Sequence, residues 1–87
     1  MNEEELDKTL AEIRTLLIEK NKRYGKGNIE RFGEKGLVIR TNDKVERLIQ
    51  MLWNAVPDTE DERVEDIWRD LAGYAIIALM VRRRKWN

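Results

Sequence analysis

The run of apolar residues from Leu71 to Val81 constrains the fold of this chain more than any other feature of its sequence. At 100° per residue, its side chains point in every direction around a helix. A helix that is apolar on all sides must be buried on all sides. The run is also too short to cross a bilayer, which needs about 20 apolar residues. We therefore predict a helix that is buried against other helices and does not enter a membrane.

A chain of 87 residues has few other helices with which to surround this one. A second subunit is the natural cover, since symmetric dimers are the commonest oligomers. Small residues in the run, among them Ala72, Gly73, Ala75 and Ala78, allow another helix to approach closely. We predict a homo-oligomer, a dimer or larger, that forms through a helix over about 60–85. The alternative is that other helices of the same chain cover most of this surface.

Capping boxes predict where two helices begin. Asn2 with Glu5, and Thr59 with Glu62, have the spacing at which a polar side chain accepts a hydrogen bond from an N–H group of the first turn. The first pair predicts a helix that runs to about Lys22. The second pair predicts the start of the last helix.

Glycines divide the chain between these two helices. Ile29–Phe32 predicts one short helical turn, which Gly33 closes, and Gly36 releases the chain into a helix over about 37–54. The predicted fold class is therefore all-α, a small helical bundle of three main helices plus a short helical turn, completed by oligomerisation. Residues 1–87 form a single helical domain.

Composition excludes several kinds of chemistry. The chain has no cysteine and no histidine, which removes disulfides, thiol catalysis and the usual general base. Any catalysis would depend on carboxylates and a hard metal ion such as Mg²⁺. Seventeen basic and seventeen acidic residues cancel, so the net charge attracts neither nucleic acid nor membranes. The basic run Arg82–Lys85 matches the dipole at a helix C-terminus and is too small to predict a nucleic-acid partner.

Two carboxylates of the last helix are the first candidates for a site. Asp66 and Asp70 lie one turn apart and point the same way, so they repel each other unless a cation lies between them. Asp70 also lies where the helix enters its apolar half, and a buried carboxylate is costly unless it is paired. The cation is either Mg²⁺ or the basic side chains of the preceding helix. The spacing does not decide between them.

Those basic side chains are Arg40, Lys44 and Arg47, which share one arc of the preceding helix with Asp43. Arginine donates two parallel hydrogen bonds to a phosphate and lysine adds a point charge, so the group predicts a phosphate clamp. The simpler interpretation is an ordinary surface ion pair between Asp43 and Arg47, which are four residues apart.

The end of the first helix is the third candidate. Tyr24 is followed by Gly25, and such a pair can place an aromatic ring beside free backbone N–H groups, where a base could stack. The alternative is that Tyr24 only closes the helix. The segment Tyr24-Gly25-Lys26-Gly27-Asn28, which we predict to be an irregular turn with two glycines, lacks the Gly-Lys-Ser/Thr ending of a P-loop, which excludes that motif.

Four pieces of the sequence occur in an order typical of a known family. They are Glu19-Lys20-Asn21 with Tyr24-Gly25, then Phe32-Gly33, then Arg40 with Asp43-Lys44 and Arg47-Leu48, and finally Glu65-Asp66 with Asp70-Leu71-Ala72 and Tyr74-Ala75. Through them, over residues 16 to 81, the chain resembles the nucleotide modification associated domain family, type one, of phages and bacteria. The resemblance implies a role in nucleotide metabolism or DNA modification.

The chain is also similar, less closely, to the MazG-like all-α nucleoside triphosphate pyrophosphohydrolases. These are helical oligomers that hold Mg²⁺ with acidic pairs from successive helices. Asp43 and Glu46 stand for the first pair, and Glu65 or Asp66 with Asp70 for the second. The first pair begins with Asp where the family has Glu, and the second is spaced by four or five residues where the family has three.

These resemblances imply a protein that acts on or binds nucleotides, and two functions fit this description. The first is a Mg²⁺-dependent nucleotide pyrophosphohydrolase. Its predicted metal ligands are Glu19, Asp43, Asp66 and Asp70. Its predicted substrate-binding residues are Lys20, Asn21, Tyr24, Arg40, Lys44 and Arg47. The second is a module that uses the same basic residues to bind or sequester a nucleotide without catalysis.

A plain oligomeric interaction protein is a further hypothesis, which needs only the apolar last helix. The acidic N-terminal residues do not have the pattern of a secretory signal peptide. The expected location is therefore the cytoplasm, or the host cytoplasm for a phage protein.

Overall fold

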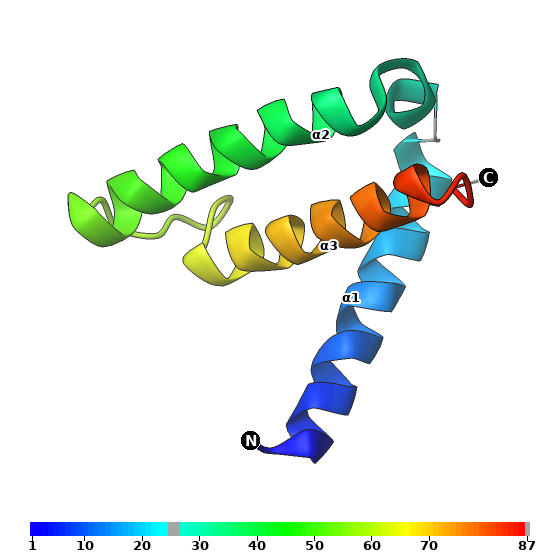
Figure 1. Ribbon diagram of the computed structural model, residues 1–87. Coiled ribbons are helices and arrows are strands. Elements are labelled where there is room, and N and C mark those ends of the chain that lie inside the picture. Colours follow the sequence, from blue (N-terminus) through cyan, green and yellow to red (C-terminus); the bar gives the residue numbers. More distant parts are fainter. Residues whose placement is uncertain (25–26, 87) are drawn as a thin grey trace.

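The computed structural model describes residues 1–24 and 27–86 (Figure 1). Within these residues the secondary structure is helical and contains no strand, which confirms the predicted all-α class. The elements are α1 (Glu3–Tyr24), α2 (Gly27–Leu48), the π-helix η1 (Ile49–Trp53), which continues α2, and α3 (Val64–Arg82). Helices α2 and α3 lie side by side and run in opposite directions. Helix α1 crosses the second half of α3, and its N-terminal half projects away from the other two helices.

Helix α1 begins where the first capping box predicts. The Asn2 side-chain oxygen accepts a hydrogen bond from the backbone N–H of Glu5, at 3.0 Å, which satisfies one of the free donors of the first turn. The helix continues two residues past the predicted end at Lys22. Ile13 is buried, whereas Leu6 and Leu10, earlier on the same apolar stripe, are 41% and 54% exposed.

Helix α2 contains the predicted short turn, but not the predicted gap after it. Gly33 (φ 57°, ψ −148°) kinks the chain, and the helix resumes directly, so Gly36 is helical and does not release the chain. A Cβ atom on Gly36 would lie 2.7 Å from Cβ of Phe32. The glycine is therefore needed for close packing across the kink, and its interpretation as a helix breaker was wrong.

The second capping box forms a turn and not a helix start. The backbone N–H of Glu62 donates to Oγ1 of Thr59 at 3.1 Å, and the N–H of Thr59 donates to the carbonyl of Glu62 at 2.9 Å. The Glu62 carboxylate does not complete the box, because it binds Arg47 of α2. Helix α3 therefore begins at Val64, later than predicted, and it ends at Arg82.

Two small apolar clusters hold α2 and α3 together. Leu48 and Met51 pack with Ile67 near η1, and Ile29 and Leu37 pack with Ile77 at the other end. Burial of such side chains contributes roughly 1.5–3 kcal/mol each to stability.

Helix α1 joins α3 where Gly73 leaves room for Leu17, whose Cδ2 atom would lie 3.0 Å from an added Cβ. The apolar half of α3 is thus covered only in part, since Ala75 and Leu79 remain exposed. In the described part of the chain, no helix is long and apolar enough to cross a membrane.

Candidate functional site

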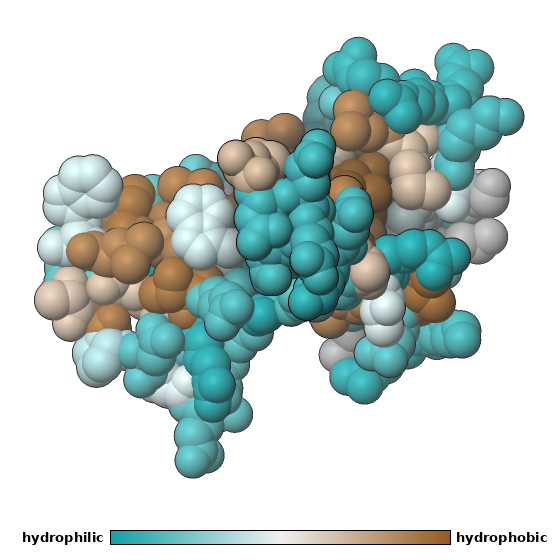
Figure 2. Space-filling view, turned by 90° about the horizontal axis from the view of Figure 1, so that it is seen from below, coloured by the Kyte–Doolittle hydropathy of each residue, from teal (hydrophilic) through white to brown (hydrophobic). Residues whose placement is uncertain are grey.

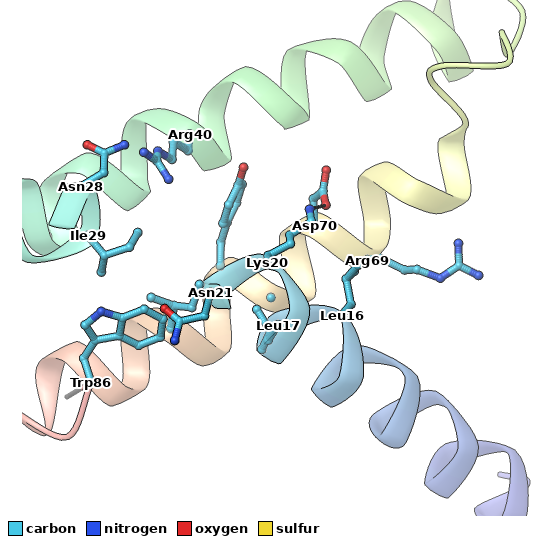
Figure 3. Close-up of a pocket in the computed structure, with 13 residues that line it drawn as sticks. Leu16, Leu17, Lys20, Asn21, Asn28, Ile29, Arg40, Arg69, Asp70 and Trp86 are labelled. Carbon is cyan, nitrogen blue, oxygen red and sulfur yellow. Dashed lines mark hydrogen bonds and ion pairs between the residues drawn. The ribbon is translucent and has the colours of Figure 1, made fainter. Parts of the chain in front are cut away.

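A cleft of about 380 Å³ lies between the three helices, beside the crossing of α1 and α3 (Figure 3). Apolar side chains of α1 and α3 form much of its wall, and polar groups converge on it from all three helices. Its described lining consists of Leu16, Leu17, Lys20, Asn21, Asn28, Ile29, Arg40, Arg69, Asp70, Gly73, Tyr74, Ile77 and Trp86. A concave surface with an apolar wall and a few converging polar groups is typical of a small-molecule site.

Asp70 of α3 joins all three helices at one edge of the cleft. Its Oδ1 atom accepts a hydrogen bond from Nζ of Lys20 on α1 at 2.7 Å, and its Oδ2 atom lies 3.0 Å from Nζ of Lys44 on α2. The carboxylate is only 16% exposed. Of the two cations that the sequence left open for Asp70, the structure has the basic side chain of the preceding helix, Lys44, and it adds Lys20 of α1.

Burial and ion pairing shift the pKa values of Asp70 and Lys44 in opposite directions. Burial alone would raise the pKa of Asp70, but hydrogen bonds and charges from Lys20 and Lys44 outweigh it and lower the pKa below 3.8. Burial likewise disfavours the charged form of Lys44, yet the hydrogen bond and charge of Asp70 raise the Lys44 pKa above 10.5. Asp70 is thus an anion and Lys44 a cation at neutral pH.

Arg40 is the basic residue of the cleft that has no anion. Its side chain extends from α2 into the cleft, on the side opposite Lys20 and Asn21 (Figure 3). It is half-buried, and no described residue forms an ion pair or hydrogen bond with it. A partly buried guanidinium without a counter-ion loses hydration without compensation, so it favours an anion from outside the chain.

Asn21, Asn28 and Trp86 supply further polar groups to the cleft. Neither amide has a hydrogen bond with another described residue. The indole Nε1 of Trp86 is buried and lacks a hydrogen-bond partner within the described ranges. Buried donors are usually satisfied, by protein, water or a ligand.

Arg47, which we predicted to belong to the same phosphate clamp, lies outside this cleft. Its Nε atom donates to Oε1 of Glu62 at 2.9 Å, so it forms a second link between α2 and the segment before α3. The hydrogen bond from Arg47 lowers the pKa of Glu62, against a smaller opposing effect of burial. The alternative ion pair between Asp43 and Arg47 does not form, because Glu62 takes its place.

The four predicted metal ligands do not converge in this structure. Asp66 pairs with Arg69 at 3.0 Å, and both oxygens of Asp70 are bound by lysines. Glu19 and Asp43 are exposed, and neither has an ion pair with a described residue. Nowhere in residues 1–24 and 27–86 do three acidic side chains form a group that could hold a metal ion. The carboxylates as arranged do not fit a Mg²⁺ site, and the metal stays a prediction.

Tyr24 is the last residue of α1, and the prediction that its ring stacks on a base falls on a side chain outside the described part of the chain. Lys20 and Asn21, one turn before it, do line the cleft. Lys44 contributes through its contact with Asp70 and does not itself line the cleft.

Sequence reasoning missed three residues of this region. Arg69 binds Glu65 at 2.8 Å as well as Asp66, and also Glu12 of α1; its i,i+3 and i,i+4 spacing from the two acids was a visible signal. Trp86 returns to the cleft after Arg84 reverses the chain with a positive φ of 57°. An isolated tryptophan after a basic run gives no indication of this. Asn28 was predicted to lie in the turn after α1, but it belongs to the first turn of α2 and lines the cleft.

The geometry defines the class of the protein as an all-α domain with a cationic cleft between three helices. No protein-family model, curated protein or solved structure matches the chain.

Proposed function

We propose that the cleft binds a nucleotide, with the phosphates at Arg40 and Lys20. The observation that supports this proposal most directly is the guanidinium of Arg40, which is half-buried in the cleft and has no counter-ion among the described residues. Guanidinium groups bind phosphate oxygens through two parallel hydrogen bonds. Lys20 can contact a phosphate as well as Asp70, because its side chain is 46% exposed.

The remainder of the cleft suits the base of a nucleotide. Tyr74, Ile77 and Trp86 provide apolar and aromatic surface, on which a flat ring can pack. The side-chain amides of Asn21 and Asn28 offer both donors and acceptors, which can pair with the polar edge of a base. The proposal agrees with the resemblance to the nucleotide modification associated domains. A cytoplasmic location, which we propose as well, would supply abundant nucleotides.

Binding without catalysis is favoured over hydrolysis. Lysines bind both oxygens of Asp70, and Arg69 binds Asp66, so these carboxylates serve as counter-ions for side chains of the same protein. A Mg²⁺-dependent pyrophosphohydrolase would need the same oxygens as metal ligands. Hydrolysis is the second candidate function, and it predicts that the protein releases pyrophosphate only when a divalent ion is present.

Calorimetric titration with nucleoside mono-, di- and triphosphates, with and without Mg²⁺, tests the proposal. We expect at least one nucleotide to bind, and Arg40→Gln to weaken its affinity by about 10- to 100-fold, the loss of one charge-assisted contact. Arg63→Gln is the matched control, because Arg63 is exposed, lies outside the cleft and has no ion pair with a described residue.

Equal affinity of the Arg40→Gln variant and the wild type would contradict the proposal. Phosphate release in the same samples, stopped by a chelator, would favour the hydrolase over the binding module. Full binding in the presence of the chelator, with the nucleotide recovered intact, would favour the binding module.

Self-association is the other part of the proposal. Trp53, Trp68 and Leu79 are 85%, 55% and 50% exposed. Figure 2 shows apolar atoms gathered over the end of the molecule that η1 and the beginning of α3 form. Exposure on this scale is typical of a protein–protein interface. The helix over about 60–85, which contains α3, remains our proposed site of homo-oligomerisation.

A further inference from the structure

Other helices of the same chain pack against two faces of α3, and a third face remains uncovered. Ile67 packs with side chains of α2 and η1, and Gly73 faces Leu17 of α1, whose Cδ2 atom would lie 3.0 Å from a Cβ added there. At 100° per residue, the third side carries Trp68, Ala72, Ala75 and Leu79 within an arc of about 60°, directed away from both neighbours. We call these four residues the Trp68 face.

The Trp68 face is apolar and uncovered. Trp68 and Leu79 are 55% and 50% exposed, Ala75 is exposed and Ala72 is half-buried. None of the four lines the cleft. From the sequence, Gly73 and Ala78 were also expected to allow a second subunit to approach. In the structure both pack against the rest of the same chain, so they do not belong to this face.

Along the Trp68 face, the order of side-chain sizes is the same when it is read from the N-terminal end of α3 or from its C-terminal end. The spacings along the chain are four, three and four residues, and the sizes are large, small, small, large. When a second copy is turned by 180°, Trp68 therefore lies opposite the partner's Leu79, and Ala72 lies opposite the partner's Ala75. The alanines allow close approach at the crossing point, where helix axes come within 8–10 Å. A two-fold symmetric contact needs this kind of self-complementarity.

Charges beside the face favour the same arrangement. Glu65 and Arg83 flank opposite ends of the face on the same side, each about 50° from its centre line. The Glu65 side chain is 76% exposed and Arg83 is exposed as well. In the antiparallel arrangement, each Glu65 lies near the partner's Arg83, so unlike charges meet at both ends. A parallel arrangement would bring like charges together.

We propose that two copies of this chain form an antiparallel, two-fold symmetric dimer through the Trp68 face. This inference rests on the proposed self-association and is independent of nucleotide binding. The dimer leaves the cleft of each subunit open, since the face and the cleft share no residue.

Sedimentation equilibrium of the full chain tests the face. We expect the wild type to be a dimer and Leu79→Glu to weaken dimerisation by about 100-fold or more, because two carboxylates would be buried against apolar surface. Leu10→Glu is the matched control, since Leu10 is 54% exposed on the projecting half of α1, and it should leave the dimer intact. A monomeric wild type, or a dimer equally stable in Leu79→Glu, would overturn the proposal.

Disulfide cross-linking tests the direction of packing, because the chain has no cysteine of its own. Oxidising a mixture of Glu65→Cys and Arg83→Cys should link the two variants to each other, while each variant alone should stay unlinked. Linkage of each variant to itself would instead demonstrate parallel packing and overturn the antiparallel arrangement. Nucleotide titration of Leu79→Glu separates the two proposals: unchanged affinity in a monomeric variant shows that the cleft does not depend on the dimer.

Discussion

At the level of single residues, Asp70 connects all three main helices. Its two oxygens bind Lys20 of α1 and Lys44 of α2 at 2.7 and 3.0 Å, while it is itself part of α3. The sequence indicated that Asp70 needs a cation, because an acidic residue entering an apolar helix is costly when unpaired, but it left Lys44 and its basic neighbours open beside a metal ion. It did not indicate Lys20, since contacts between residues 50 positions apart depend on how α1 crosses α3.

Asp70→Asn should destabilise the protein by about 1–2 kcal/mol at neutral pH, because two lysines lose their anion and both are partly solvated. The Asp70 pKa lies below its ordinary 3.8 in the folded state. The stabilisation is therefore complete above 3.8 and is lost as the pH falls through the lowered pKa. Thermal melts at several pH values should show the gap between variant and wild type closing in acid.

Asp61→Asn is the control for this series, because Asp61 is exposed and has no ion pair with a described residue. Its melting temperature should follow that of the wild type at every pH. A gap between Asp70→Asn and the wild type that stayed constant down to the most acidic sample would contradict the assignment of the effect to the Asp70 charge.

At the level of the helices, the kink at Gly33 determines how α2 reaches the cleft. Its φ of 57° and ψ of −148° lie in a region that is open almost only to glycine. The kink separates Asn28 and Ile29, at one end of the cleft, from Arg40 on the longer part of the helix. Sequence reasoning correctly placed a helix end at Gly33, but it extended the break to Gly36, whose packing against Phe32 only coordinates reveal.

Gly33→Ala should destabilise the protein by about 1–3 kcal/mol, because a Cβ atom is strained at this backbone conformation. Gly27→Ala is the matched control: its φ is not positive, and no atom lies within 4 Å of the position of the added Cβ. Urea unfolding of both variants measures the difference. Equal free energies of unfolding for the two would show that the kink is not a fixed feature of the helix.

The boundaries of the last helix illustrate a similar limit of sequence reasoning. Thr59 and Glu62 do form the predicted local hydrogen bond at 3.1 Å, but a local bond does not reveal whether a helix follows. The competing partner of the Glu62 carboxylate is Arg47, fifteen residues earlier in the chain. The periodicity of apolar residues predicted the existence of the main helices, whereas the start of α3 also involves a partner far away in the sequence.

At the level of the whole molecule, the buried core is small for a chain of 87 residues. The described apolar residues that are buried are Ile13, Ile29, Leu37, Leu48, Met51, Ile67 and Ile77. Small domains have little stability to spare, and large exposed side chains such as Trp53 and Trp68 contribute little while they remain in water. Under the proposed dimer, association would supply a substantial part of the stability.

The melting temperature should therefore rise with protein concentration, since dilution favours the less stable monomer. Circular dichroism melts over an about 100-fold range of concentration would measure this dependence. The Leu79→Glu variant should melt at a lower temperature, with no concentration dependence. A wild-type melting temperature that does not vary with concentration would indicate that the single chain is sufficient for folding.

The attachment of α1 has a further consequence for the cleft. Besides Leu17, which packs against the cluster that contains Ile77, two ion pairs link α1 to α3: Glu12 binds Arg69, and Lys20 binds Asp70. A phosphate that approaches Lys20 competes with Asp70 for the same ammonium group. If the cleft binds phosphate as proposed, ligand entry and the docking of α1 would form a single coupled equilibrium, and dissolved salt, which screens both interactions, would act on the two together.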